Sequence, residues 1–334
     1  MIKIQPRTLA ILCCLVPAAL GFSACDVNSQ VNVSSNGINS SSSASSSGDN
    51  SSAPAITWTI SGSVYKAASG TVSLSVDTNY GARITSFQGN GTEVLFYNGS
   101  LNSGSAFWPS PQSAWPWSGN WPSPTNFDLI PYAAAFSNAS NALVLNSLEQ
   151  PALGVSIRKI ITGNPSSNEI TLTYGIYNDT PTNVLWAPWE ITRVPNSAIV
   201  FFPKETSNYV GNSSPQFPIA LETTNQFWCQ NGNNYTKLFR DGAEGWIGVC
   251  YNGMLFVKKY PNLSISQFAP GESDVEVYAG GNYYEVEDQG AYTSIAPGAW
   301  FNWSVTWRCT NLPANATAAV GSSSLYQLAE ALAQ

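Results

Sequence analysis

Two glutamates near the end of the chain have the spacing of a catalytic or ligand-binding pair. Glu285 and Glu287 follow Tyr283 at every second position of a predicted strand, so the three side chains should lie on one face of a sheet. Two neighbouring carboxylates repel each other, which raises the pKa of one and suits acid or base chemistry. The alternative is a solvated strand edge beside Asp288. We treat both glutamates as candidate catalytic residues.

The absence of histidine restricts this chemistry. None of the 334 residues is a histidine, which excludes imidazole acid–base catalysis, Ser–His nucleophiles and histidine-ligated metals. Catalysis would rest on carboxylates, tyrosines or lysines, and we expect no cofactor and no metal. Calcium binding by Asp274, Glu276 and Glu287 is an alternative that no recognisable loop motif supports.

A segment rich in tryptophan and proline is the second candidate site. Residues 104–122 contain Trp108, Trp115, Trp117 and Trp121 among repeated prolines. Proline lacks a backbone donor and favours extended or turn geometry, so this segment is predicted to be a stiff loop, neither a helix nor a central strand. Indoles on such a loop suit stacking against sugar rings. Alternatively, they fold beneath the loop as a small core.

Further candidate ligand-binding side chains are charged or aromatic residues within predicted strands and loops. Each charged candidate has a structural alternative, namely solvent exposure for Arg83, bracing of a loop for Asp128, and a mutual ion pair for Glu190 and Arg193. The full set of ligand-binding candidates is Arg83, Trp108, Trp115, Trp117, Asp128, Trp186, Trp189, Glu190 and Arg193.

The N-terminal region predicts export. Residues 1–25 combine a basic start, an apolar stretch and small residues before Cys25, a pattern similar to a bacterial lipoprotein signal in which that cysteine is lipidated. An ordinary signal peptide cut nearby is the alternative. Residues 26–55 are mostly Ser, Asn and Gly and predict a flexible tether. We expect a membrane-anchored protein, periplasmic or at the cell surface.

The charge and the cysteine content restrict which binding partners and how many disulfides are expected. Acidic residues outnumber basic ones by 20 to 13, so nucleic acid, which draws on clustered basic residues, is not an expected partner. The only expected contact with a membrane is through the lipid anchor. Outside the signal, Cys229, Cys250 and Cys309 permit at most one disulfide.

Residues 56–334 have the pattern of one large all-β domain. Alternating apolar and polar residues predict successive strands, mostly antiparallel, and Ser322–Leu332 alone has helical spacing. Trp300, Trp303 and Trp307 are interpreted as core. The predicted strands are 56–60, 71–76, 82–88, 93–97, 142–146, 154–162, 169–178, 183–194, 199–203, 245–251, 254–259, 274–278, 283–287 and 301–308.

Motifs at both ends of this domain resemble galactose-mutarotase-like proteins. The run Gly-Ala-Arg-Ile-Thr-Ser-Phe at 81–87, followed by 91–95, is similar to the opening hairpin of that superfamily. Residues 283–287, Ala296-Pro297-Gly298 and 301–308 are similar to its closing strands.

Three motifs between them are more specific. Ser-Ala-Phe-Trp-Pro-Ser-Pro-Gln at 105–112, Phe-Asp-Leu-Ile-Pro-Tyr at 127–132 and Trp-Ala-Pro-Trp-Glu-Ile-Thr-Arg at 186–193 resemble an uncharacterised bacterial lipoprotein family placed within that superfamily. The likeness spans about residues 60–310 in a consistent order.

The resemblance implies a β-supersandwich whose broad concave sheet binds sugars in many members. Aldose epimerases of this superfamily pair a histidine acid with a glutamate base. One of Glu285 and Glu287 matches the region of that base, whereas the missing histidine excludes the usual mechanism. Carbohydrate recognition is therefore the expected function. The alternatives are a carbohydrate-active enzyme (epimerase, lyase or hydrolase) and a surface scaffold with buried tryptophans.

Overall fold

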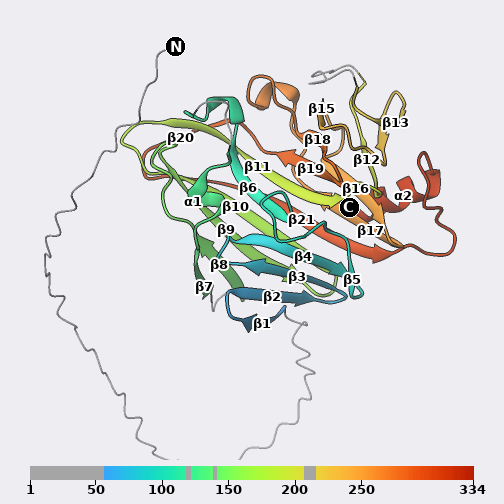
Figure 1. Ribbon diagram of the computed structural model, residues 1–334, viewed down its shortest axis with the longest axis horizontal. Helices are drawn as coiled ribbons and strands as arrows, with labels where there is room; N and C mark the ends of the chain where they lie inside the picture. The colour runs from blue at the N-terminus through green and yellow to red at the C-terminus, as the bar shows by residue number, and fades with distance from the viewer. Residues whose placement is uncertain (1–55, 118–121, 138–140, 207–215) are drawn as a thin grey trace, which may run out of the picture. The chain divides into compact units, whose positions relative to one another are not determined.

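The computed structural model describes residues 56–117, 122–137, 141–206 and 216–334, which belong to one compact unit. Two large antiparallel β-sheets make up most of this unit (Figure 1). The all-β fold class is confirmed. The predicted signal peptide, the tether with Cys25, and Trp121 lie outside the described residues.

The sheet that carries the candidate glutamates is called the front sheet here. The described residues give it eleven strands: β1 (Thr57–Ser61), β2 (Val64–Ser69), β3 (Val72–Asp77), β4 (Arg83–Gly89), β6 (Ser105–Ser110), β11 (Val184–Pro195), β19 (Tyr283–Gln289), β18 (Val275–Ala279) and β15 (Thr236–Arg240), with β5 (Thr92–Glu93) beside β4 and β20 (Thr293–Ile295) beside β11.

The second sheet is the back sheet. Within the described ranges its ten strands run in the order β13 (Ile219–Glu222), β14 (Gln226–Cys229), β12 (Ile199–Pro203), β16 (Trp246–Tyr251), β17 (Met254–Lys259), β21 (Trp300–Asn311), β10 (Glu169–Asn178), β9 (Val155–Asn164), β8 (Ala142–Asn146) and β7 (Ala133–Ser137).

Helices are few and short. α1 (Thr125–Asp128) follows the tryptophan-rich segment, and 3-10 turns lie at Gln112–Ala114 and Ile265–Gln267. The expected C-terminal helix is α2 (Ser323–Leu332), where the Ser322 hydroxyl accepts a hydrogen bond from the Leu325 amide at 3.3 Å. None of the helices described is long and apolar enough to cross a bilayer.

Aromatic side chains join the two sheets. Phe107 of β6 stacks on Tyr174 of β10 with ring centroids 4.2 Å apart, and Phe87 of β4 packs against both Phe256 and Trp307 of the back sheet at 5.1 Å. Side chains alternate along a strand, so the residues between these core positions point out of the sandwich, onto the outer face of the front sheet. We call this outer face the front face.

The proline-rich segment contradicts one prediction. Residues 105–110 form β6, a fully buried strand between β4 and β11, although their prolines predicted a loop that could not be a central strand. The register explains the difference, because Pro109 lies directly opposite Pro188 of β11. The two residues that lack an N–H face each other, so the ladder loses its donors at one step only.

A second prediction fails for a different reason. The expected strand at 93–97 is reduced to Thr92–Glu93. The Glu93 carboxylate accepts hydrogen bonds from the amides of Phe87, Val94 and Leu95 at 2.9–3.1 Å. A side chain thus takes the place of a strand partner. The strands that the sequence pattern missed are β2, β6, β7, β13, β14, β15 and β20.

The turn before β4 is held from the back sheet. Gly81 has φ +59°, and a Cβ there would lie 2.1 Å from the carbonyl oxygen of Phe127, so this close approach requires glycine. Lys159 of β9 is buried, and its Nζ donates to the carbonyls of Gly81 and Ala82 at 2.9 and 2.8 Å. These contacts fix the point where Arg83 enters the sheet.

We expect Lys159 to make stability depend on pH. Burial, followed by the nearby Arg83 charge, lowers the pKa of Lys159 to about 7. The unfolded chain holds this proton up to roughly pH 10, so Lys159 by itself should contribute a rise in the free energy of unfolding between about pH 7 and 10, on the order of 1–3 kcal/mol, which comparison with a variant separates from the buried thiols that titrate in the same range. Urea unfolding of the protein and of Lys159→Met across that range measures it. The variant should lack this contribution. If the free energies of unfolding of the two proteins change with pH in parallel, a group other than Lys159 is responsible for the titration.

Candidate functional site

Charged residues of three neighbouring strands meet on the front face. Arg193 of β11 lies opposite Glu285 of β19, which lies opposite Tyr278 of β18. One step along the same face, Glu287 of β19 lies opposite Glu276 of β18. Directly paired residues of antiparallel strands share a face, so the pairing gathers these side chains into one cluster.

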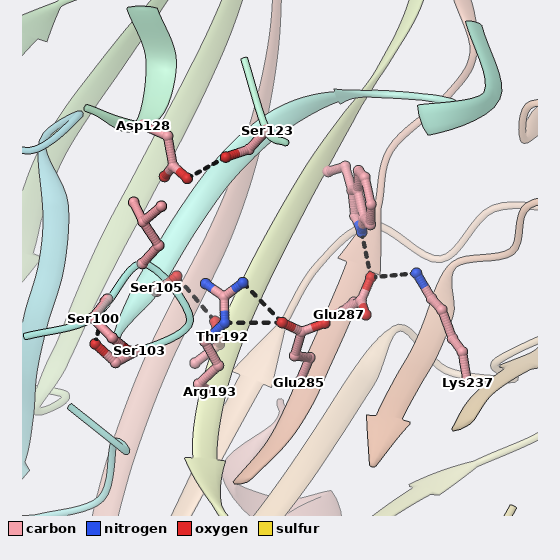
Figure 2. A network of polar contacts seen from close by, with 12 residues as sticks. Ser100, Ser103, Ser105, Ser123, Asp128, Thr192, Arg193, Lys237, Glu285 and Glu287 are labelled. Carbon is pink, nitrogen blue, oxygen red and sulfur yellow. Dashed lines mark hydrogen bonds and ion pairs between the residues drawn. The ribbon is translucent and has the colours of Figure 1, made fainter. Parts of the chain in front are cut away.

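Arg193 holds the Glu285 carboxylate. Its Nε and Nη2 lie 3.0 and 2.8 Å from the same oxygen, Oε1 (Figure 2). The Arg193 side chain is fully buried, whereas that of Glu285 keeps 16% exposure. The expected alternative, an ion pair between Glu190 and Arg193, is wrong, because residues three apart on a strand point to opposite faces. Glu285 is therefore the end of this pair that solvent and ligands can reach.

Glu287 lies deeper in the same face. One of its oxygens, Oε2, accepts hydrogen bonds from Trp189 Nε1 at 2.7 Å and Lys237 Nζ at 2.8 Å (Figure 2), and Lys237 also pairs with Glu276. The other oxygen, Oε1, has no hydrogen-bond partner among the described residues. Burial first, and the charge of Glu285 less strongly, raise the pKa of Glu287 against the opposing effect of Lys237. The expected upward shift is confirmed, with desolvation rather than repulsion as its main cause.

A pocket opens beside Glu285. It has a volume of about 250 Å³ and is lined by Asn102, Tyr278, Tyr283 and Glu285. Burial raises the pKa of Tyr283 to about 12, so its hydroxyl stays protonated and can donate a hydrogen bond at neutral pH. The pocket thus offers ring faces, two phenol donors, an amide and a fixed carboxylate acceptor. These groups can bind a hydroxylated ring.

The predicted stacking tryptophans pack against one another. Trp115 and Trp189 contact Trp108 edge-to-face, with centroids 5.8 and 5.3 Å away, and these three indoles are only 2–3% exposed. Trp186 is also buried at 7%, whereas Trp117 is half-buried. Their role in ligand binding stays a prediction. In this structure the ring faces of the buried indoles contact protein.

Glu190 points into the core between the sheets. Its carboxylate accepts from the Tyr174 hydroxyl at 2.5 Å and lies 3.0 Å from Lys258 Nζ. Lys258 also pairs with Asp288, and all three charged side chains are fully buried. Burial raises the pKa of Asp288 despite the opposing lysine. This cluster, called the core ion cluster here, lies beneath the strands that carry Arg193 and Glu285.

Arg83 and Asp128 form a separate buried ion pair. Arg83 Nη1 also donates to the carbonyls of Leu101 and Ser103 at 2.8 and 3.0 Å. Figure 2 shows the hydrogen bond that Asp128 accepts from the Ser123 hydroxyl, at 2.5 Å. This arrangement fits the bracing alternative for Asp128. Exposure of Arg83 on a polar face is excluded, since the residue is 3% exposed.

Sequence reasoning missed several exposed tyrosines around these sites. Tyr80, Tyr97 and Tyr235 are 55%, 43% and 69% exposed. Each follows or precedes an asparagine in a turn or strand end. A bulky aromatic residue beside turn-forming residues was the available signal, because turns present their side chains to solvent.

Metal and thiol chemistry gain no support from the described part of the chain. It contains no group of three or more Cys, Asp or Glu side chains placed to hold a metal ion. Cys229, Cys250 and Cys309 are free and buried. Burial raises the pKa of the Cys250 thiol to about 11, so it stays protonated at neutral pH.

Comparison with known proteins defines the fold. An Escherichia coli K12 protein provisionally named an aldose 1-epimerase superposes with TM-score 0.52 at 12% identity, covering 75% of this chain and 99% of its own. A galactose mutarotase-like protein from Lactobacillus casei gives 0.50 at 10% identity, covering 76% and 100%. A TPR-domain protein from Parabacteroides distasonis gives 0.50 at 13% identity, covering 75% of this chain and 48% of its own.

The chain therefore has the galactose mutarotase-like fold. At these identities the likeness shows the fold and no activity. No protein-family model matches the sequence, and no curated protein sequence matches it significantly.

Proposed function

We propose that this protein binds carbohydrate in the pocket beside Glu285. The observation that carries the proposal is a partly exposed carboxylate fixed by a buried arginine, next to two tyrosine rings that line the same pocket. Carboxylates and phenols exchange hydrogen bonds with sugar hydroxyls, and flat rings pack on the apolar face of a pyranose. The fold, which is shared with mutarotase-like proteins, is consistent with this use.

Location is part of the proposal. The N-terminal pattern ending at Cys25 supports export and attachment to a bacterial membrane by a lipid, with the Ser-rich segment as a tether. Such an arrangement would present the pocket at a membrane surface, periplasmic or extracellular.

Catalysis is the second candidate function. Glu285 and Glu287 lie on one face, and the buried Glu287 has a raised pKa, as a general acid requires. Its carboxylate is fully buried, so only Glu285 of this pair touches the pocket. The structure therefore gives Glu285 the better position for contact with a substrate.

Proton NMR of a glycan panel mixed with the purified protein tests both functions. Line broadening of sugar signals with unchanged anomeric signals supports binding, and new or interconverting anomeric signals support catalysis. Glu285→Gln should weaken sugar binding by about ten- to a hundredfold, because it removes charge-assisted hydrogen bonds. The free protein should remain folded, since glutamine keeps an oxygen that can accept from the buried Arg193, and thermal unfolding of the variant verifies this.

Glu169→Gln is the matched control. Glu169 pairs with Arg308 at 2.8 Å on the back sheet and has 17% side-chain exposure, close to the 16% of Glu285. This variant should bind sugars like the unaltered protein. The assignment of the pocket is contradicted if both variants lose sugar binding equally. It is also contradicted if sugar signals still broaden in the presence of the Glu285→Gln variant.

A further inference from the structure

Aromatic side chains continue on both sides of the Glu285 pocket. Tyr278 and Tyr283, which line it, have ring centroids 6.4 Å apart. Phe96 stacks on Tyr283 at 5.5 Å, and Tyr97 follows in the chain. A methyl group placed on Gly281, in the turn before Tyr283, would lie 2.7 Å from the Tyr235 hydroxyl, so that ring borders the opposite side.

Tyr80 completes this series. Tyr80 and Tyr97 line a common pocket of about 120 Å³ together with Leu101 and Leu129. We call the whole series the aromatic row, and it consists of Tyr235, Tyr278, Tyr283, Phe96, Tyr97 and Tyr80.

One segment of the chain contributes to the lining of several hollows along this row. Residues 95–102 line the pocket at Glu285 through Asn102, the pocket at Tyr80 through Tyr97, and a third pocket of about 480 Å³ through Phe96 and Tyr97. A single sugar ring would fill the first of these. The three hollows share this segment as part of their lining, so together they provide room for several rings.

The backbone at one end of the row supports a functional purpose. Tyr235 has φ +58°, a left-handed conformation that is unfavourable for a bulky side chain, and its ring is 69% exposed. Packing does not explain an aromatic ring held outward at such a cost. Strained residues of this kind occur preferentially at binding sites.

Charge along the row selects the type of ligand. Each basic group near it already has a carboxylate partner: Arg83 pairs with Asp128, Arg193 with Glu285, and Lys237 with Glu276 and Glu287. An acidic sugar would meet the partly exposed Glu285 instead of an available cation. Uncharged sugars avoid this repulsion.

We infer that the ligand is a neutral glycan chain of several residues, lying along the aromatic row with one ring in the pocket at Glu285. The inference rests on the proposed function and adds the class of ligand. Tyrosines beside pockets that combine apolar and polar groups suit sugar rings, which have an apolar face and hydroxylated edges, better than a protein partner, for which a continuous apolar patch is typical.

The experiment compares chain lengths. Calorimetric or NMR titration would use neutral gluco-, manno-, galacto- and xylo-oligosaccharides from one to six residues, with oligogalacturonates as the charged series. For at least one neutral series we expect the affinity to rise about tenfold or more from the single sugar to the longest chain, as additional rings are stacked. The charged series should bind more weakly at every length.

Variants on either side of the pocket at Glu285 locate the bound glycan chain. Tyr97→Ala and Tyr235→Ala should each weaken binding of the longest oligosaccharide by about two- to tenfold and reduce the gain with chain length. Tyr65→Ala is the control, because Tyr65 is a half-buried tyrosine of β2 that packs on Phe136, away from the row. Thermal unfolding of every variant verifies that the fold is retained.

The outcomes separate the two proposals. If single sugars bind and longer chains bind with no higher affinity, the proposed role of the aromatic row is overturned and the proposed pocket is retained. Tighter binding of oligogalacturonates overturns the neutral ligand. Failure of every glycan to bind overturns the proposed function as well, and leaves the exposed tyrosines to a protein partner.

Discussion

Lys258→Met should lower the free energy of unfolding by about 3–5 kcal/mol, the cost of removing one partner from a buried ion pair. Lys258 Nζ lies 3.0 Å from Glu190, pairs with Asp288 and donates to the Val286 carbonyl at 3.1 Å, in the core between the two sheets. Methionine has a similar shape but no charge. It would leave two buried carboxylates without their cation.

The pH dependence of this loss identifies its origin. Lys258 opposes the rise that burial causes in the pKa of Asp288, so without it this pKa rises further above its unfolded value, and the lost stability should return as pH falls and Asp288 becomes protonated. Denaturant unfolding at several pH values measures this. Adding Glu190→Gln and Asp288→Asn to the variant should recover part of the loss at neutral pH.

Lys66→Met is the matched control for this prediction. Lys66 lies on β2 and is exposed, so its replacement should change stability by less than about 0.5 kcal/mol. A similar small effect at Lys258 would mean that the core ion cluster does not hold β11 and β19 together. The two strands carry Arg193 and Glu285, so the cluster also supports the proposed site from below.

Trp115→Ala should destabilise the protein by about 3–5 kcal/mol, as expected for truncating a buried indole. The ring is 2% exposed, packs on Trp108 and Trp189, and donates through Nε1 to the Pro109 carbonyl at 2.9 Å. Urea unfolding measures the loss, and sugar titration of the folded variant measures its effect on binding.

Trp117→Ala is the comparison variant within the same segment. This indole is half-buried, with its Nε1 donating to the Pro122 carbonyl at 2.9 Å, and its removal should cost less, about 1–2 kcal/mol. If Trp115→Ala instead leaves stability unchanged and abolishes sugar binding, the indole stacks on ligand and the buried arrangement is not the functional one.

Local patterns predicted much of the sandwich. The strands at 142–146, 169–178, 199–203 and 254–259 were predicted with the bounds that the structure has. Period-two alternation depends only on neighbouring residues, because one face of each strand meets the core. The same holds for the cap and apolar face of α2. Proline also acts locally, but its effect at β6 was misjudged because Pro188, which faces Pro109, is distant in the sequence.

The candidate site was predicted in part. Strand periodicity placed Tyr283 and Glu285 on one face, and both line the pocket. The partners of these residues could not be predicted, because Arg193 reaches Glu285 through strand pairing over 92 positions, and Lys237 reaches Glu287 over 50. Such pairs depend on strand order and register, which periodicity leaves open.

The sequence by itself determined that histidine chemistry is absent, that the chain builds antiparallel strands and a C-terminal helix, and that carboxylates and aromatic residues are available. Only the tertiary structure decided which of them a ligand can reach. The tertiary structure buried Trp108, Trp115 and Trp189 against one another and turned Glu190 into the core. It brought Tyr278 of β18 and Tyr283 of β19 together beside Glu285 on the front face. Burial depends on what packs over a residue and not on the residue type alone.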